Sequence, residues 1–187
     1  SLDTGKWIME ECSKTMKRVS LELGGKNPVI VMDDADLELA LEGVLWGAFG
    51  TTGQRCTATS RLILHEKIKD EFMKRLLAKA KALRIGSGLF PETDIGPVIN
   101  KAQLEKIERY VKIGKEEGAT LLYGGNRIDP GLPGYFFEPT IFVDVRPDMR
   151  IAQEEIFGPV LGVFTVSDLE EAITLANNTR YGLSSAI

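Results

Sequence analysis

Short apolar segments alternate along the chain with longer helical patterns, and this alternation limits the fold more than any other feature of the sequence. The apolar segments are typical of strands buried on both faces, and parallel strands need helices as crossover connections. We therefore predict an α/β fold with an open, mostly parallel sheet flanked by helices. The expected strands are residues 27–32, 61–65, 120–123 and 160–166, with one or two extended segments in residues 135–145. The expected helices are residues 3–17, 35–48, 68–83, 103–118 and 167–176.

Two local patterns add detail to this fold. Residues 18–23 alternate polar and apolar side chains, which predicts a further strand that Gly24–Gly25 ends. Glu22 would then lie near the carboxyl end of a strand, the edge of an open parallel sheet where sites are found. The helix at residues 35–48, with Asp34 as its N-cap, is apolar on most sides, so we expect it to be deeply packed.

The composition argues against several classes of function. The chain has 23 lysines and arginines against 27 aspartates and glutamates, and a net charge of −4 gives no electrostatic reason to expect nucleic acid or an anionic membrane as a partner. No apolar run approaches the length of a membrane span. Two cysteines and one histidine predict neither a disulfide scaffold nor a metal site, and they are typical of a reduced, cytoplasmic protein.

The two ends of the chain predict a fragment of a longer protein. The first residue is Ser1 rather than methionine, and residues 181–187 have the pattern of a strand that has just begun. A natural domain usually closes with a polar tail or a capped element. A short natural protein that has lost its start residue is the alternative.

Cys56 is the candidate nucleophile. It lies in a glycine-containing loop beside the cation Arg55, and a nearby positive charge favours the reactive thiolate. For a cysteine considered alone, an inert core residue is the commoner explanation, and it is the clear one for Cys12 on the inner face of a helix. His65 falls at the end of an apolar strand, so we expect it to mark a solvated strand end rather than to form a dyad with Cys56.

Without a histidine, a carboxylate must act as the base, and Glu22 is the candidate. A partly buried carboxylate has a raised pKa and can accept a proton near neutral pH. The pattern is equally compatible with a glutamate on the solvent side of the strand, because Leu21 and Leu23 point the other way.

Phe157 is the candidate aromatic contact for a flat ligand. It precedes the rigid turn Gly158–Pro159, and its ring could stack on a ligand or simply pack, with packing the simpler explanation. The chain has no glycine-rich dinucleotide fingerprint, no phosphate-binding P-loop and no zinc-protease motif.

Taken together, several segments resemble the aldehyde dehydrogenase superfamily, over nearly the whole chain. Residues 21–26, followed by Asn27–Pro28, are similar to the glutamate signature of that family, and residues 49–57, which contain Cys56, are similar to its cysteine signature. A single such motif would be weak, but an ordered set is very specific. Further family-like segments follow in the expected order at residues 94–97, 138–140, 153–159 and 177–183.

The resemblance implies a role for each candidate residue. The thiolate of Cys56 would attack an aldehyde carbon, and the backbone N–H of Cys56 would supply half of the oxyanion hole. Hydride would leave to NAD or NADP, and Glu22 would activate the water that hydrolyses the thioacyl enzyme, which favours the hydrolytic branch over transfer to coenzyme A. Glu155 would hold the nicotinamide ribose, Phe157 would contact the nicotinamide side of the cofactor, and Ser1 would lie near the cofactor phosphates.

The resemblance also implies a domain organisation. Residues 1–26 would be the C-terminal remnant of a dinucleotide-binding domain, and residues 27–187 would be the catalytic domain, truncated at its C-terminal end. The missing parts carry most of the cofactor domain and the asparagine that completes the oxyanion hole. We therefore expect a cytoplasmic, homo-oligomeric full-length enzyme that acts on a small-molecule aldehyde, and a fragment that is inactive in hydride transfer by itself.

Two other functions remain open at this point. The first is hydrolysis of esters or thioesters at Cys56 without the redox step, which needs only a nucleophile and a base. The second is a catalytically silent structural or subunit-interaction module, whose exposed surfaces would favour self-association.

Overall fold

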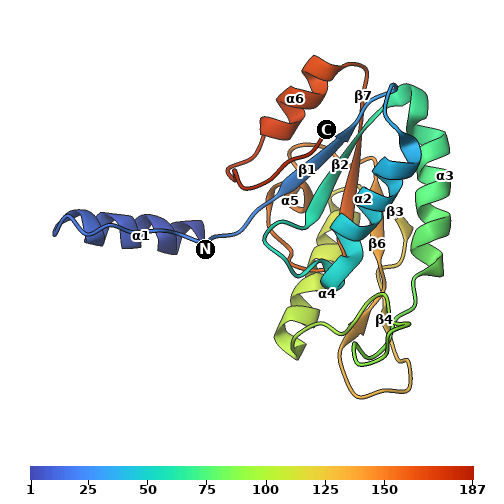
Figure 1. Ribbon diagram of the computed structural model, residues 1–187, viewed down its shortest axis with the longest axis horizontal. Coiled ribbons are helices and arrows are strands. Elements are labelled where there is room, and N and C mark those ends of the chain that lie inside the picture. The colour runs from blue at the N-terminus through green and yellow to red at the C-terminus, as the bar shows by residue number, and fades with distance from the viewer.

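Five strands form the central sheet of the computed structural model, which describes residues 1–187. Of these, four run parallel: β1 (Asn27–Val31), β2 (Thr59–His65), β7 (Val160–Val166) and β6 (Thr140–Val143). The fifth, β3 (Thr120–Tyr123), is antiparallel to β6. The predicted α/β fold with a mostly parallel sheet is therefore confirmed. In spatial order the strands are β1, β2, β7, β6 and β3 (Figure 1).

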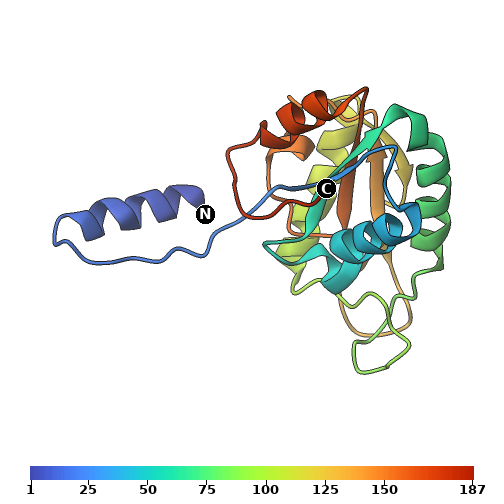
Figure 2. The same ribbon diagram turned by 45° about the horizontal axis from the view of Figure 1, so that its top comes forward.

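Helices cover both faces of the sheet, as strands that are buried on both sides require. Within β2, Leu62 and Leu64 pack into the core on one face and Ile63 packs into the core on the other. All three side chains are fully buried, so truncating one of them to alanine would cost about 2 to 5 kcal/mol. One face is covered by α2 (Leu37–Phe49) and α3 (Glu66–Ala82), and the other by α4 (Lys101–Glu116), α5 (Arg150–Gln153) and α6 (Leu169–Asn177) (Figures 1 and 2).

Smaller elements complete the fold. The short 3-10 helix η1 (Gly50–Gly53) follows α2, and β4 (Arg127–Ile128) pairs with β5 (Phe136–Phe137) in a separate two-stranded sheet. None of the helices combines the length and apolar character that crossing a lipid bilayer requires.

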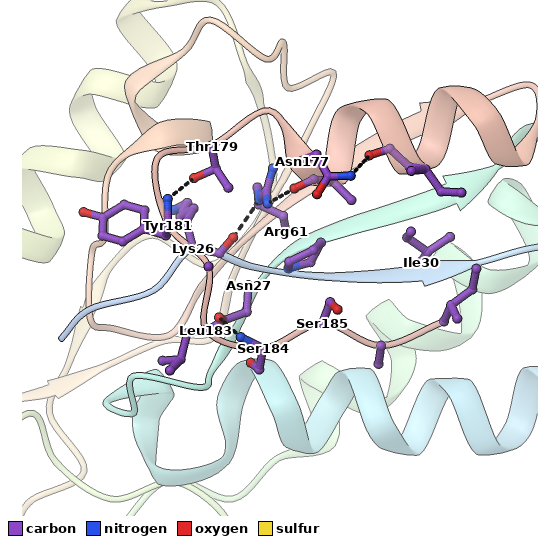
Figure 3. A pocket seen from close by; sticks show the side chains of 16 residues that line it. Lys26, Asn27, Ile30, Arg61, Asn177, Thr179, Tyr181, Leu183, Ser184 and Ser185 are labelled. Carbon is purple, nitrogen blue, oxygen red and sulfur yellow. Dashed lines mark hydrogen bonds between the residues drawn. The ribbon is translucent and has the colours of Figure 1, made fainter. Parts of the chain in front are cut away.

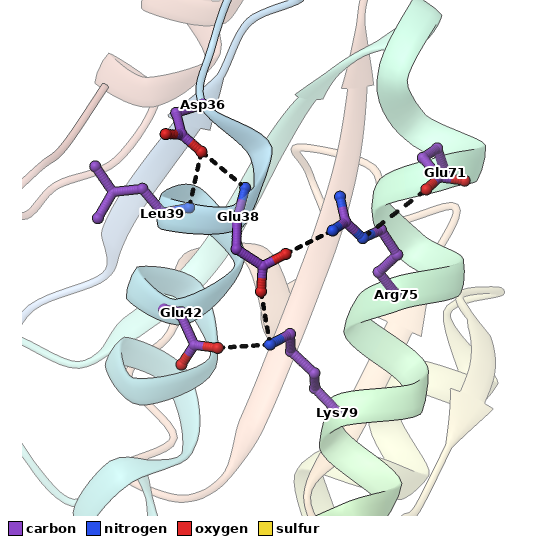
Figure 4. A network of polar contacts seen from close by, with 7 residues as sticks. All are labelled: Asp36, Glu38, Leu39, Glu42, Glu71, Arg75 and Lys79. Atoms are coloured by element: carbon purple, nitrogen blue, oxygen red, sulfur yellow. Dashed lines mark hydrogen bonds and ion pairs between the residues drawn. The ribbon is translucent and has the colours of Figure 1, made fainter.

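Helix α2 differs from its prediction in its start and in its burial. It begins two residues later than expected, because Asp36 rather than Asp34 accepts the N–H groups of Glu38 and Leu39 (Figure 4). The side chains of Leu39 and Trp46 are 73% and 58% exposed. The expectation of a deeply packed helix is therefore wrong, because α2 lies in an outer layer and its far side faces solvent.

Exposed ion pairs link α2 to α3. Lys79 on α3 contacts Glu38 and Glu42 on α2, and Arg75 also contacts Glu38 (Figure 4). Each of these side chains is partly or largely open to solvent. Such pairs contribute about 1 kcal/mol or less each, so the apolar layer beneath them dominates the packing of the two helices.

Helix α1 (Leu2–Ser13) and the extended residues 18–23 form an arm that leads away from the sheet in both views (Figures 1 and 2). Residues 18–23 pair with no other strand, so the strand predicted there is wrong. Their alternation has another cause, because Leu21 and Leu23 approach Gly5 of α1 across the arm.

The carboxy-terminal residues return to the free edge of β1. Ala186 forms a parallel bridge with Val29, and its backbone bonds to Pro28 and Ile30 at 3.2 and 2.9 Å. The strand beginning expected in residues 181–187 is thus present as a single bridged residue.

Candidate active site

Three loops that carry the candidate motifs enter the sheet at the same edge. Residues 24–26 lead into β1, residues 55–58 lead into β2 and residues 155–159 lead into β7. These three strands are parallel neighbours, so their amino ends lie side by side. The expected position at a carboxyl edge is therefore wrong, because Glu22 precedes a strand instead of ending one.

The turn that carries Cys56 is built from the end of α2. Thr51 and Thr52 adopt positive φ angles of 53° and 60°, which turns the chain sharply out of the helix. The N–H of Ala58 then donates to the carbonyl of Arg55 at 3.1 Å and closes the turn around Cys56. The Cys56 side chain is half-buried.

Arg55 anchors this turn to α2. Its guanidinium donates to the carbonyls of Trp46 and Gly47 at 3.0 and 3.1 Å, and it lies 4.2 Å from the centre of the Trp46 ring. A cation at the carboxyl end of a helix interacts favourably with the helix dipole. Arg55 therefore stabilises the conformation of the turn that contains Cys56.

The pair Gly24–Gly25 brings the chain into contact with both of the other loops. The N–H of Gly25 donates to a carboxylate oxygen of Glu155 at 3.0 Å. A Cβ atom on Gly24 would lie 2.2 Å from the other Glu155 oxygen, and one on Gly25 would lie 2.6 Å from the carbonyl oxygen of Cys56. Only residues without a side chain fit here, so the glycine pair is a requirement of the close approach.

The loop that carries Glu155 and Phe157 is held in a strained conformation. Phe157 has a positive φ of 61°, which is uncommon for a residue with a bulky side chain. Gln103 of α4 donates to the carbonyls of Ile156 and Phe157 at 2.8 and 2.9 Å and fixes this geometry. Backbone strain of this kind clusters at functional sites.

Glu22 and Ser1 lie on the arm. Glu22 is exposed, and no hydrogen bond joins it to Cys56 or Glu155. Ser1 is the N-cap of α1, where its hydroxyl accepts the N–H of Thr4. The structure thus brings Cys56, Glu155 and Phe157 to one edge of the sheet, and it leaves Glu22 and Ser1 outside that cluster.

His65 lies at the carboxyl end of β2, at the opposite end of that strand from the Cys56 turn. It is 5% exposed, and its Nδ1 accepts the N–H of Lys67 as the N-cap of α3. The expected solvated strand end is therefore wrong, because the imidazole is buried as a helix cap.

Lys26 is buried directly beside the cluster. Its side chain is 1% exposed, and its ammonium nitrogen has no hydrogen-bond partner. The pKa of Lys26 is lowered to about 7, first by burial and then by the charge of Arg61, while Glu155 and Glu154 partly oppose this shift. Arg61 holds the surrounding backbone, since its guanidinium donates to the carbonyls of Lys26, Leu175 and Ala176.

A cavity lies beside Lys26, at the start of β1. It has a volume of about 590 Å³ and lies between β1 and the carboxy-terminal residues (Figure 3). Lys26, Asn27 and Arg61 line it, and Cys56, Glu155 and Phe157 do not. A second cavity of about 20 Å³ is lined by residues of all three loops, among them Glu155 and Phe157.

Sequence reasoning gave no functional role to Asn27 or Gln103. Asn27 donates a hydrogen bond to the Cys56 turn. Its place in the sequence, two residues after Gly25, could have indicated a role at the site. Gln103 carried no signal, because its partners lie more than fifty residues further along the chain.

Comparisons with known proteins agree with this architecture. The sequence model described as "Aldehyde dehydrogenase family" matches residues 1–187. The chain is 50% identical over 188 residues to betaine aldehyde dehydrogenase of Bacillus subtilis, covering 100% of this chain and 38% of that protein.

Solved structures agree equally well. A structure of betaine aldehyde dehydrogenase from Staphylococcus aureus in complex with NAD+ has a TM-score of 0.95 at 44% identity, over 100% of this chain and 38% of that one. An NAD-dependent aldehyde dehydrogenase from Sinorhizobium meliloti has a TM-score of 0.94 at 45% identity, over 99% and 37%.

The chain therefore spans less than two fifths of the length of these relatives. Within that span the family model, the sequence identity and the shared fold all agree. The chain belongs to the aldehyde dehydrogenase family.

Proposed function

We propose that the protein to which this chain belongs oxidises an aldehyde to a carboxylic acid with NAD(P)+, and that Cys56 is its nucleophile. The observation that carries this proposal is the convergence of three loops at one edge of the sheet. The N–H of Gly25 donates to the carboxylate of Glu155, and the carbonyl of Cys56 occupies the space that a side chain on Gly25 would need, so the loops of the nucleophile and of the candidate cofactor residue lie on either side of one glycine.

Cys56 forms and releases the covalent intermediate. Its thiolate sulfur bonds to the aldehyde carbon, and the carbonyl electron pair moves onto oxygen as an oxyanion that the backbone N–H of Cys56 stabilises. Loss of the former aldehyde hydrogen as hydride leaves a thioester on Cys56. Attack by water then breaks the carbon–sulfur bond, which regenerates the thiolate and yields the carboxylic acid.

Glu155 and Phe157 fit the nicotinamide end of NAD(P)+. Glu155 uses one carboxylate oxygen for the N–H of Gly25 and is only half-buried, so it retains acceptor capacity for ribose hydroxyls. The half-buried ring of Phe157 gives an aromatic surface beside it. When bound, NAD(P)+ supplies the hydride acceptor. Ser1, at the start of α1, is proposed to face the cofactor phosphates.

Glu22 is proposed as the base that activates the hydrolytic water. It lies three residues before Gly25, and an extended chain advances by at most about 3.5 Å per residue. The backbone of Glu22 therefore lies within about 10 Å of Gly25, which packs closely beside the Cys56 turn. An exposed side chain on an unpaired segment is free to turn toward the nucleophile.

A division of the chain into two parts is also proposed. Residues 1–26 are proposed to belong with a dinucleotide-binding domain, and residues 27–187 with the catalytic domain. The projection of the arm away from the sheet supports this division (Figures 1 and 2). We also propose that the complete enzyme is a cytoplasmic homo-oligomer.

A chimera tests the proposed activity. In the Bacillus subtilis relative, the matching 188 residues are replaced by this chain, which is 50% identical to them. We expect aldehyde-dependent reduction of NAD+ by the chimera and its loss in Cys56→Ala. Activity that survived in Cys56→Ala would contradict the assignment of the nucleophile.

Thiol alkylation of the chain itself provides a second test. Cys12 and Cys56 are both half-buried, so the comparison between them is matched for exposure. We expect a neutral alkylating reagent at pH 7 to label Cys56 several times faster than Cys12, as read from the two peptides by mass spectrometry. Equal and slow labelling would contradict an activated thiol and would favour a catalytically silent module.

A further inference from the structure

We propose that Asn27 is a positioning residue that fixes the Cys56 turn in place beside the segment that carries Gly25 and Glu22. This inference rests on the proposed function, because it assigns the support of its nucleophile. Asn27 is the first residue of β1 and is 4% exposed. Its amide nitrogen donates to the carbonyls of Cys56 at 2.7 Å and Ala58 at 2.9 Å.

The orientation of the Asn27 amide follows from its partners. Two carbonyl oxygens can only accept, so the NH2 group must face the Cys56 turn. On the other side of the amide, the backbone N–H of Ser184 donates to the side-chain oxygen Oδ1 of Asn27 at 3.2 Å (Figure 3). The reverse orientation would oppose like groups at all three contacts, so the amide is held in one state.

This one side chain holds two backbone carbonyls of the turn, those of Cys56 and Ala58. Cys56 and Ala58 lie on either side of Thr57, and Asn27 bridges their carbonyls from the neighbouring strand. Because the peptide plane after Cys56 is held, the direction in which its side chain leaves the backbone is restricted. Catalytic geometry of this kind depends on supporting hydrogen bonds around the reacting group.

The same short stretch also holds Glu155. Gly25, two residues before Asn27, donates its N–H to the Glu155 carboxylate. Residues 25–27 therefore contact the nucleophile turn through a side chain and the candidate cofactor residue through the backbone. Removal of the Asn27 amide should release the first contact and leave the second in place.

The test uses Asn27→Ala and Asn27→Ser, with Asn178→Ala as the matched control. Asn178 is exposed, and its side-chain amide makes no hydrogen bond. In the chain, we measure hydrogen exchange of the Ala58 N–H, which closes the turn. Loss of two hydrogen bonds should speed this exchange by about tenfold in Asn27→Ala. Asn27→Ser keeps one donor and should give an intermediate rate.

In the chimera, the same variants report on catalysis. We expect Asn27→Ala to lower kcat several-fold and to leave the KM for NAD+ unchanged, since the Glu155 contact remains. Unchanged exchange and unchanged kcat in Asn27→Ala would overturn the inference. An inactive parent chimera would instead count against the proposed function, and the exchange of Ala58 would still decide the role of Asn27.

Discussion

The buried side chain of Lys26 lowers the stability of the folded chain at neutral pH. Its ammonium group is buried without a hydrogen-bond partner, next to the guanidinium of Arg61. Burial and a neighbouring cation both disfavour the charged form. The native state therefore binds the Lys26 proton more weakly than the unfolded chain does, with a pKa of about 7 against 10.5.

This difference predicts how stability depends on pH. Between pH 7 and 10.5 the unfolded state holds more protons, so the free energy of unfolding should rise with pH across that window, and below pH 7 the full cost of Lys26 is present. Lys26→Met should stabilise the chain at pH 7 and remove this rise. Urea unfolding at several pH values measures both effects.

Lys74→Met is the control for Lys26→Met, because Lys74 is exposed on α3. It should leave the slope of stability against pH unchanged. A slope that Lys26→Met also left unchanged would show that the Lys26 ammonium is solvated in solution.

The two candidate carboxylates should differ in the step they affect. In the chimera, Glu22→Gln should slow hydrolysis of the thioester by about 100-fold or more, so that a burst of reduced cofactor precedes a slow steady state. Glu155→Gln should slow formation of the thioester, so no burst appears. Stopped-flow absorbance separates the two results, and unchanged steady turnover in Glu22→Gln would exclude Glu22 as the base.

At the scale of elements, the start of α2 depends on which of two neighbouring aspartates points back to the helix. Both Asp34 and Asp36 suit an N-cap by residue type, and the sequence pattern favoured the first. The structure uses the second, whose carboxylate accepts two backbone N–H groups. A cap depends on backbone geometry within one turn, which residue type alone does not define.

The pair of aspartates therefore provides a matched test. Asp36→Ala should lower the free energy of unfolding by about 1 kcal/mol, because two N–H groups at the start of α2 lose their acceptor. Asp34→Ala should change it by about 0.5 kcal/mol or less. Urea unfolding of the two variants at pH 7 decides between the positions, and an equal loss in both would contradict the assignment.

At the scale of the whole molecule, the arm and the sheet are held together very differently. Sheet residues such as Leu62 are fully buried between two helical layers, whereas Trp7 and Met9 of α1 are 61% and 55% exposed. Exposed apolar side chains on a projecting helix add little to stability. The arm should therefore open or be removed independently of the sheet.

Deletion of residues 1–23 tests this independence. The remaining chain should keep a cooperative unfolding transition, and its free energy of unfolding should change by about 0.5 kcal/mol or less. Leu62→Ala, as a reference for core damage, should lose about 2 to 5 kcal/mol. Circular dichroism during urea unfolding compares them, and loss of cooperativity in the truncated chain would mean that the arm belongs to the core.

The sequence predicted four of the five strands of the sheet and most helices, because buried parallel strands and amphipathic helices leave strong local patterns, and it placed β6 only within a broader extended segment. It failed at residues 18–23, where the alternation of a strand arises from packing against α1 instead. It failed again at the burial of α2, since an apolar helix can face solvent when nothing covers its outer side.

The sequence by itself determined the α/β class, the family and the motif residues, because each depends on residue type and order along the chain. Only the tertiary structure decided that the motif loops meet at the amino ends of β1, β2 and β7, and that Asn27 bridges the turn around Cys56. The reason is physical: strand order and register bring together residues that are far apart in the chain, and local pattern contains no information about those distances.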